Sequence, residues 1–542
     1  MQVTETLKPV SDRQKSGYKR DFNPLDVFFF NVMGFALGLA LSINPSFIGG
    51  FAPSSNILLV IILGGVLGLC NGLIYGWFGA IMPNTGGDFV FVSRSINHRL
   101  GFLTSWGFSF CQIYGMAMNI GWIITMGIAP SLITIGYSFD KPELIQFAGN
   151  LSNHYIIVGS LLILLFYWLI SILGFTLTRW VAIILFLIGM LGPILMTVIL
   201  INTSHADYVS GFNAFMFKTN KSKDAFLQLI SSAKGLGMVV STNPGSVFYD
   251  SLKALPIGFL CYLGFTYSVY VGGEVAKPEK SQMKGILWAL FLGVTSFAIC
   301  MSLYANRVGQ EFHAAVGNPD AIQKIGLPAN SLNFLLGIVA KDPWENLLMQ
   351  TGNLIWFILV PYVMLQVCVR NVMAWTLDGL LPVIFLKRSK GPNQPWIVNT
   401  LICIIALVFI IINSFWGISL VGAVALAAVA YLFTSLAALV LQTTNPDAYA
   451  KLPLSARKKF LGIDSNFKVI GFICVIAFVW VIYASIFFPE ISGGSTYRAI
   501  FMVLGIYILG LIFYQVQRNK LKKKSENANV NWDELFKEIP ED

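Results

Sequence analysis

The chain has 542 residues, of which 56% are hydrophobic and only 11% are charged. Its mean hydropathy is +0.71. A soluble protein of this length could not bury so large an apolar surface, so the composition excludes a soluble globular protein. The formal net charge of +10 is the bias expected of loops that face anionic lipid, and we expect no nucleic-acid partner.

Twelve stretches of the sequence are long and apolar enough to cross the hydrocarbon core of a bilayer, which takes about 20 residues. The sequence therefore predicts an all-α integral membrane protein with twelve transmembrane helices. The predicted spans are residues 25–49, 57–82, 100–129, 155–177, 180–202, 252–273, 285–305, 346–377, 396–416, 418–442, 467–488 and 498–517.

Most of the 36 Lys and Arg residues fall on the side that holds both termini when these spans alternate across the bilayer. Cytoplasmic loops carry an excess of basic residues, so we predict a multi-pass protein of the cell membrane with both termini in the cytoplasm. The predicted divisions are a cytoplasmic tail (1–24), a membrane domain (25–517) and a second cytoplasmic tail (518–542).

The first predicted span contains two glycines four positions apart, Gly34 and Gly38, in the segment NVMGFALGLALS. Small residues at this spacing let two helices pack closely. Glycines also interrupt the helices that form the binding sites of many transporters. The sequence leaves both interpretations open, and the segment from Gly34 to Gly38 is where we expect this span to break.

The connection between the second and third spans reads MPNTGGDFVFVSRSINHRLGFLTSWG, from Met82 to Gly107. Pro83 ends the preceding helix. Gly86 and Gly87 permit backbone conformations or close contacts that other residues hinder. An ordinary glycine-rich turn is the alternative interpretation. Farther along, the long external segment 203–253 has short helical stretches and is either a lid or a simple cover.

The sixth predicted span and its exit read FLCYLGFTYSVYVGGEVAKPEKSQMKGI, from Phe259 to Ile286. Gly264 falls at mid-membrane depth, and Glu274 follows two glycines at the cytoplasmic end. Gly264 marks either a close helix–helix contact or a break in the helix. A broken helix exposes N–H groups on one half and C=O groups on the other, which suit the two charged groups of an amino acid.

The eighth span ends in VRNVMAWTLDGLLPVIFLKRSKGPNQ, residues 369–394. Arg370 and Asp378 are eight residues apart, about two helical turns, so they can share one face of the helix. They either anchor the end of the helix or take part in a cytoplasmic gate.

These segments resemble those of the amino acid–polyamine–organocation (APC) superfamily of transporters. Residues 369–394 resemble its S-R-x-x-x-A-x-A-R-D-G-x-x-P signature. Residues 82–107 resemble P-x-x-G-G-x-Y-x-Y, with Phe89 and Phe91 where tyrosines are usual. The sixth span resembles a G-F-E-like break followed by E-E-V-K-N-P, except that Thr266 replaces the mid-helix acid and Glu274 is the one exit glutamate that remains.

The resemblance implies a leucine-transporter-like fold with a 5+5 inverted repeat, over about 25–202 and 252–442, plus two additional helices over 467–517. It implies a secondary transporter of amino acids that works by alternating access, with broken helices one and six forming the site. The first span lacks the G-S-G-like triplet of the family, so the resemblance does not fix the residues that bind the substrate carboxylate.

The predicted substrate-binding residues lie at the two expected breaks and on aromatic positions that core packing would explain equally well. They are Gly34, Phe35, Gly38, Tyr114, Tyr262, Gly264, Phe265, Thr266 and Tyr431. The predicted cytoplasmic gate contains Arg94, Glu274, Arg370 and Asp378. We expect Glu274 to meet Arg94 or Arg370 when this gate closes.

None of the twelve predicted spans carries Asp, Glu, Lys or Arg near its midpoint. A buried cation would ordinarily need a carboxylate partner, so we expect a small or neutral zwitterionic amino acid as substrate. Polyamines, organic cations and nucleobases are the alternative substrates. Some proton-coupled relatives resemble one another in a lysine on the fifth span, which residues 180–202 lack. Proton symport by another route, sodium symport, exchange and facilitated diffusion all stay open.

The sequence offers no paired acids, metal-ligand cluster or activated nucleophile within the spans, and the seven cysteines form no C-x-x-C pair. We therefore predict that the protein is not an enzyme and needs no cofactor beyond a coupling ion. The expected partners are a small-molecule substrate and the lipid bilayer. The oligomeric state and the particular amino acid are not determined, and a non-transporting receptor on the same fold is the remaining alternative.

Overall fold

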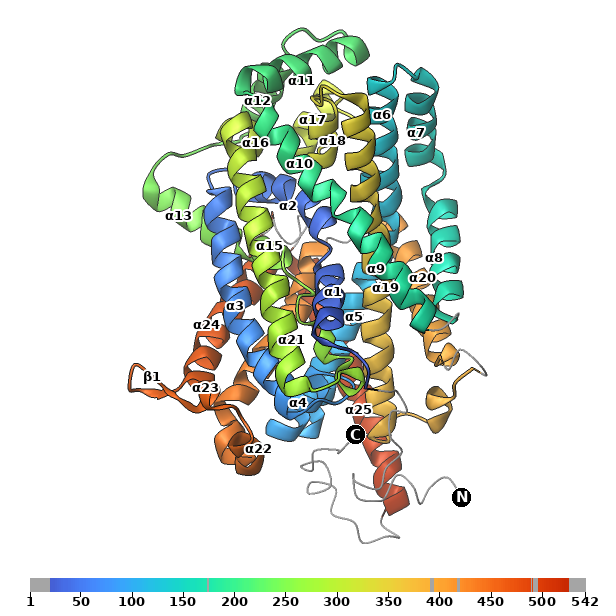
Figure 1. Ribbon diagram of the computed structural model, residues 1–542, viewed down its shortest axis with the longest axis vertical. Helices are drawn as coiled ribbons and strands as arrows, with labels where there is room; N and C mark the ends of the chain where they lie inside the picture. Colours follow the sequence, from blue (N-terminus) through green and yellow to red (C-terminus); the bar gives the residue numbers. More distant parts are fainter. Residues whose placement is uncertain are drawn as a thin grey trace.

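The computed structural model describes residues 20–172, 175–389, 394–416, 420–488, 490 and 496–525. These residues form an elongated bundle of long helices (Figure 1). Ten described segments are long and apolar enough to cross a membrane, and an eleventh is added if Pro142–Leu151 and Ile156–Ile172 form one bent span. The ten segments are Pro24–Phe51, Ile57–Ile81, His98–Ser138, Trp180–Asn202, Pro278–Val308, Pro343–Leu377, Trp396–Asn413, Val424–Thr444, Asn466–Phe487 and Thr496–Leu521.

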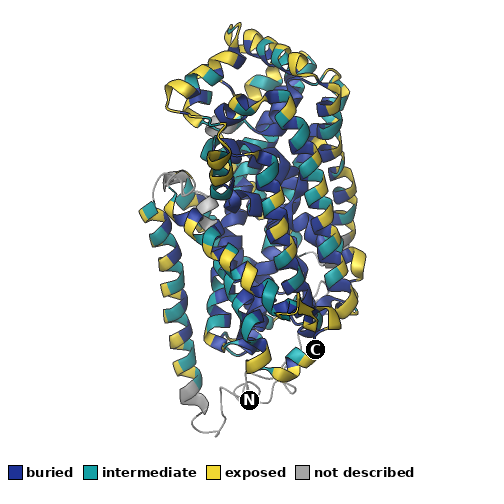
Figure 2. Ribbon diagram, turned by 90° about the vertical axis from the view of Figure 1, so that its left-hand side faces the viewer, coloured by how far each residue is buried: buried dark blue, intermediate teal, exposed yellow. Residues whose placement is uncertain are grey.

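Buried residues fill the interior of the bundle, and exposed and half-buried residues lie on its outer surface (Figure 2). Many of the exposed residues are large and apolar. Trp288 and Phe291 are each more than 60% exposed, and Val66 and Phe472 are more than half exposed. Such side chains are stable on a surface that faces lipid tails instead of water. The structure thus confirms the multi-pass membrane class that the composition predicts.

The spanning segments are built from the following helices. They are α1 (Pro24–Phe35), α2 (Leu37–Phe51), α3 (Ile57–Ile81), α5 (His98–Trp122), η3 (Ile123–Ile128), α6 (Ala129–Ser138), α7 (Pro142–His154), α8 (Ile156–Ile172), α9 (Phe175–Gly189), α10 (Leu191–Asn202), α14 (Leu255–Leu260), α15 (Pro278–Val308), α19 (Pro343–Leu377), α20 (Trp396–Trp416), α21 (Leu420–Thr444), α24 (Asn466–Phe487) and α25 (Thr496–Ser525).

The sixth predicted span, 252–273, is not a continuous helix. Only α14, six residues long, is regular, and it is followed by turns and by the short 3₁₀-helices η4 (Tyr267–Val269) and η5 (Gly272–Glu274). The sixth predicted span is therefore not among the long helices, and it is irregular where the sequence predicts a break.

Shorter elements gather at the two ends of the bundle. One end carries α11 (His205–Asn220), α12 (Ala225–Gly235), α16 (Gln310–Val316), α17 (Pro319–Ile325) and α18 (Leu332–Gly337), while α13 (Pro244–Lys253) packs on α3 (Figure 1). The opposite end is where the described chain begins at residue 20 and ends at residue 525, and it is called the termini end below. It holds α4 (Asp88–Ser95), η6 (Val383–Leu386), α22 (Pro446–Ala450), α23 (Leu454–Arg457) and the antiparallel pair β1 (Lys459–Phe460) and β2 (Asp464–Ser465).

The segment 203–253 contains the short helices that its sequence predicts, and it packs firmly against α16 and α17. Phe226 of α12 stacks on Phe312 of α16, with ring centroids 4.3 Å apart. Aromatic stacking of this kind joins the segment to the connection after α15, so the two form one cap over this end of the bundle.

The first span breaks at Ala36, between α1 and α2. Ala36 has φ 49° and ψ 67°, a left-handed conformation that is unfavourable for a residue with a side chain. Both interpretations of the Gly34–Gly38 segment hold. The helix breaks within it, at Ala36, and Gly34 also packs closely against Gly264, in the irregular part of the sixth span. A Cβ added to Gly34 would be 2.6 Å from the carbonyl oxygen of Gly264, whose own φ is +116°. Gly38, by contrast, faces the ring of Trp356.

We predict that Gly264→Ala will destabilise the fold by about 3 kcal/mol or more, because it adds backbone strain to overpacking. Its Cβ would lie 2.3 Å from the carbonyl carbon of Gly34. Gly505→Ala is the control, since it lies in α25 with no heavy atom within 4 Å of the added Cβ. Thermal unfolding in detergent should show a large loss for the first variant and none for the second. Equal melting temperatures would contradict the packing described here.

Candidate functional site: a cavity between two helix breaks

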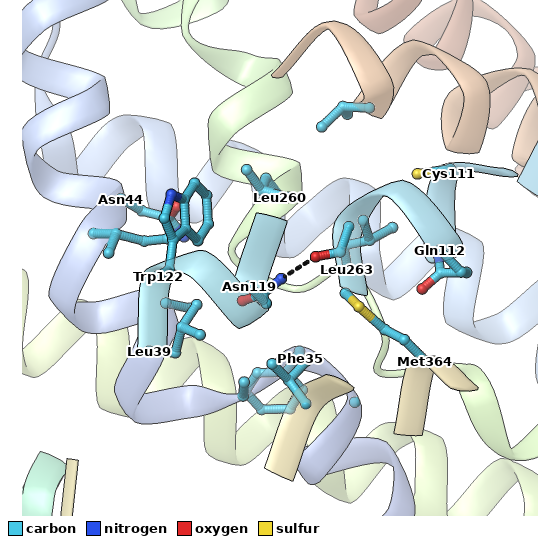
Figure 3. Close-up of a pocket in the computed structure, with 17 residues that line it drawn as sticks. Phe35, Leu39, Asn44, Cys111, Gln112, Asn119, Trp122, Leu260, Leu263 and Met364 are labelled. Atoms are coloured by element: carbon cyan, nitrogen blue, oxygen red, sulfur yellow. Dashed lines mark hydrogen bonds between the residues drawn. The ribbon is translucent and has the colours of Figure 1, made fainter. Parts of the chain in front are cut away.

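A cavity of about 50 Å³ lies beside the break between α1 and α2 and is also lined by α5, by α14 with the residues that follow it, and by α19 and α21. Figure 3 shows Phe35 and Leu39 from the two sides of the break, together with Gln112 and Asn119 from α5. The cavity is large enough for a few water molecules and smaller than the pockets of roughly 300–1,000 Å³ that hold small ligands. Binding of a whole amino acid therefore requires the cavity to widen.

Three amide side chains line this cavity, and each has one polar atom with no hydrogen-bond partner among the described residues. These atoms are Asn44 Oδ1, Gln112 Nε2 and Asn119 Oδ1. Buried polar atoms are nearly always paired, and leaving one unpaired costs about 1–3 kcal/mol. Two acceptors and one donor therefore remain for a polar ligand.

The other end of each amide is fixed by the protein. Asn44 Nδ2 donates to Cys261 Sγ at 3.2 Å, and Asn119 Nδ2 donates to the carbonyl of Gly115 at 2.8 Å, the dashed line in Figure 3. Gln112 Oε1 accepts from the hydroxyl of Tyr267 at 2.5 Å. The amides are thus held in place by α5 and by the irregular segment after α14.

Main-chain groups add to the polarity of the site. The break at Ala36 ends α1 and begins α2, so the last carbonyls of one helix and the first amides of the next lack partners within their own helix. Helix N-termini attract anions and C-termini attract cations. Among the described residues that line the cavity, none is an Asp, Glu, Lys, Arg or His.

The structure places only part of the predicted substrate-binding set at this cavity. Gly34 and Phe35 line it, and Gly264 touches Gly34 from behind. Gly38 packs against Trp356 and Asn353 on α19, which takes it away from the cavity. The binding roles of these residues stay predictions.

The remaining predicted residues are buried in packing outside the cavity lining. The Tyr262 hydroxyl donates to the carbonyl of Ile61 at 3.1 Å, and the Tyr114 ring packs on Phe409. Three further positions lie in the packed interior, Phe265 beside Gly72, Tyr431 between Tyr75 and Phe478, and Thr266 fully buried.

The sequence interpretation missed Asn44, Gln112, Asn119 and Trp122, which all line the cavity. The sequence did contain one indication of their role, since three of them are amides inside apolar spans. Polar residues at such depth usually face the interior of the bundle and serve function.

The predicted gate residues form two buried ion pairs at the termini end. Of the two partners predicted for Glu274, the structure pairs it with Arg370, whose Nε and Nη2 each lie 3.0 Å from Oε1 of the glutamate. The two side chains are 0% and 3% exposed, and Arg370 also donates to Gln366.

Arg94 pairs with Asp378 instead of Glu274, donating from Nη2 to both carboxylate oxygens at 3.1 and 3.0 Å. His98 Nε2 lies 3.2 Å from the same carboxylate, and its Nδ1 lies 3.1 Å from the Tyr514 hydroxyl. The four predicted gate residues therefore join α4, η5 and the end of α19, and His98 adds the first residue of α5.

The described start of the chain crosses the same end. The amide of Phe22 donates to the carbonyl of Glu274 at 3.0 Å, and the amide of Ala276 donates to the carbonyl of Phe22 at 2.9 Å. The residues before α1 thus form a short parallel bridge with the exit of the sixth span. Residues 1–19 lie outside the described part of the chain.

A helical membrane bundle in which two irregular segments meet beside an interior cavity lined by apolar residues and three amides, with buried ion pairs at one end, is the arrangement of a membrane transporter. The sequence comparisons agree. The model of the amino acid permease family matches residues 22–513, so the chain belongs to that family, within the APC superfamily that its motifs resemble.

Similar proteins include the arginine/agmatine antiporter of Chlamydia pneumoniae, 24% identical over 81% of this chain and 78% of the relative. The arginine/agmatine antiporter of Chlamydia trachomatis serovar L2 is 23% identical over 93% of this chain and 91% of the relative. That of Chlamydia caviae is 24% identical over 81% and 78%. The family points to a transporter and not to an enzyme, as the sequence predicts.

We predict that Glu274→Gln will destabilise the closed termini end, because it leaves the Arg370 guanidinium buried without its counter-charge. Removing one partner of a buried pair typically costs about 3–5 kcal/mol. Amide hydrogen exchange of residues 267–276 should accelerate, and the melting temperature should fall. Glu279→Gln, an exposed carboxylate in the first turn of α15, is the matched control and should change neither. Identical behaviour of the two variants would show that the pair does not hold this end closed.

Proposed function

We propose that the protein is a secondary transporter of small, neutral, zwitterionic amino acids that works by alternating access. The observation that carries the proposal is the chemistry of the cavity. Three amides and two helix ends supply its polarity, and none of the described lining residues carries a charge. Such a site suits a solute with one positive and one negative group and no charge on its side chain.

The residues that line the cavity favour a different substrate from the arginine and agmatine in the names of the relatives. Arginine and agmatine both carry a cationic guanidinium group. A buried cation is costly unless an anion pairs with it, and here the lining offers none. An apolar side chain would instead meet Phe35, Leu39, Trp122 and Met364.

In this proposal, the first amides of α2 and Gln112 Nε2 receive the substrate carboxylate. The last carbonyls of α1, Asn44 Oδ1 and Asn119 Oδ1 receive the ammonium group. Each substrate group then meets main-chain or amide dipoles of opposite sign, so no ionised side chain is required.

The termini end is the cytoplasmic side in this proposal, closed by the pairs Glu274–Arg370 and Arg94–Asp378. Opening requires both pairs to separate or exchange partners. The two breaks, one in α1–α2 and one after α14, would occupy matching places in a 5+5 inverted repeat. Spans one, two, six and seven would rock against spans three, four, eight and nine.

We predict that a thermal-shift screen of the twenty amino acids will find stabilisation by small neutral members and none by arginine, agmatine or putrescine. A ligand that binds only the folded protein raises its apparent stability by about 2.7 kcal/mol at 100 times its Kd. Uptake or exchange of the same amino acids in proteoliposomes tests transport directly. Stabilisation by putrescine or adenine alone would overturn the substrate class, and binding without flux would favour a receptor.

We predict that Gln112→Leu and Asn119→Leu will each weaken binding of that amino acid about 10- to 150-fold. The reason is that each loses a hydrogen bond worth about 1.5–3 kcal/mol to a charged group. Gln515→Leu, an amide-to-apolar change on the exposed side of α25, should leave the affinity unchanged. Titration by thermal shift or radioligand binding measures the difference. If both cavity variants bound the amino acid with wild-type affinity, the amides would not be substrate-binding groups.

A further inference from the structure

A buried carboxyl group, Asp88, lies outside both the cavity and the two ion pairs. It is the first residue of α4, directly after Gly86 and Gly87, and its exposed fraction is 0%. Among the described residues, no Lys, Arg or His side chain forms an ion pair with it. A buried carboxylate without a counter-charge is rare and usually functional.

Asp88 is bonded to the irregular segment that follows α14. The Tyr270 hydroxyl donates to Asp88 Oδ2 at 2.9 Å, and the amide of Gly86 donates to the carbonyl of Tyr270 at 3.0 Å. Gly87, at φ +48°, is so close that an added Cβ would lie 2.9 Å from Val269 and 3.0 Å from Tyr270. The segment around Tyr270 therefore cannot move relative to the loop before α4 without breaking these hydrogen bonds and close contacts.

The titratable groups that face Asp88 are phenols. They are Tyr75 from α3, Tyr270 from the segment after α14, Tyr431 from α21 and Tyr507 from α25. On α5, His98 is turned to Asp378 and Tyr514, and Arg94 at the far end of α4 also bonds Asp378. All four phenols are neutral near pH 7, so none balances a negative charge on Asp88.

Two opposing effects act on the ionisation of Asp88. The Tyr270 hydroxyl and the amide at the start of α4 favour the ionised form, while removal from water disfavours it. Burial is the larger effect and raises the pKa of Asp88 to about 7, from 3.8. In the state seen here the group therefore holds a proton at mildly acidic pH.

The same segment reaches the cavity. Tyr267 and Tyr270 lie on one 3₁₀ turn, in which the amide of Tyr270 donates to the carbonyl of Tyr267 at 3.1 Å. The Tyr267 hydroxyl donates to Gln112, which lines the cavity and whose Nε2 has no hydrogen-bond partner among the described residues. A shift of this turn would change the surroundings of Asp88 and of the cavity amide together.

We propose that Asp88 is a proton-binding site of the transport cycle. It is protonated while the termini end is closed, and it loses its proton to water when the segment around Tyr270 moves and opens this end. The inference rests on the proposed alternating access, and it names the proton as the coupling ion. No other reactant is needed, because the step only moves a proton from the Asp88 carboxyl group to water and back.

The direction of the effect follows from the two pKa values. A carboxyl whose pKa is raised in the closed, folded state stabilises that state at low pH. This stabilisation is present in full below about pH 4 and is lost as the pH rises through about 7. By linkage, a substrate that prefers the closed state must bind more tightly at pH 6 than at pH 8.

The first experiment follows the melting temperature of the full-length protein between pH 5 and pH 9 without substrate. Asp88→Asn mimics the protonated acid, so the two melting temperatures should coincide only below about pH 4. The excess of the variant should grow from pH 5 to about pH 7 and stay constant at a few degrees above that. Asp447→Asn, an exposed aspartate in the first turn of α22, is the matched control and should show no such pH-dependent gain.

A second variant covers failure of Asp88→Asn to fold. Tyr270→Phe removes a hydrogen bond that favours the ionised carboxylate, so it should raise the pKa of Asp88 in the folded protein by about one unit. The pH above which the melting temperature stops falling should rise by the same amount. The infrared carbonyl band of a protonated carboxylic acid, recorded on wild type and variants, reports the same titration directly. An unchanged titration in every Asp88 and Tyr270 variant that folds would overturn the proton site.

The coupling is tested by flux in proteoliposomes at several pH values. We expect wild-type amino acid flux to depend on pH near 7 and to flatten in Asp88→Asn. Persistence of the wild-type pH dependence in that variant would overturn the coupling role. Absence of any amino acid flux in the wild type would instead reject the proposed function, and the titration would still decide whether Asp88 binds a proton.

Discussion

The contact between two interrupted main chains is the constraint on which this structure depends. Gly34 and Gly264 meet so closely that neither position has room for a Cβ. Helices that touch through their backbones must be interrupted or very close-packed, because side chains would otherwise separate them by 8–10 Å. Here the chain loses its helical regularity at Ala36 and after α14. The cavity lies beside this contact, so its shape and polarity follow from the same two breaks.

Every polar group in this region lies in a water-poor environment, which makes its pairing matter more than in a soluble protein. Polar and charged side chains of the interior fall into three groups. Glu274 and Asp378 form ion pairs with arginines, and each cavity amide has one bonded and one unpaired polar atom. Asp88 has no ion-pair partner among the described residues, and burial raises its pKa to about 7. We propose that the ion pairs close the termini end, that the amides bind the substrate and that Asp88 binds a proton.

Membership of the amino acid permease family shows the class of protein, whereas the chemistry of the cavity bears on which substrate it takes. The family match covers residues 22–513, whereas the relatives share only 23–24% identity with this chain. A shared fold accommodates different substrates, since selectivity depends on a few side chains at one site. In this chain those side chains are amides and apolar groups, which is why the proposed substrate differs from those in the names of its relatives.

The sequence by itself determined the membrane class, most of the spans and the family motifs, because hydropathy over about 20 residues and the conformational demands of glycine are local properties. It also located both breaks within a few residues and offered Arg94 and Arg370 as alternative partners for Glu274. Only the tertiary structure decided that Asn44, Gln112 and Asn119 face the cavity while Tyr114 and Tyr262 do not. It also showed that Arg94 pairs with Asp378 and that Asp88 forms no ion pair with any residue in the described part of the chain. Those outcomes depend on how each helix is rotated about its axis and on which distant segments meet. A span that is apolar on every side carries no periodic pattern from which that rotation can be inferred.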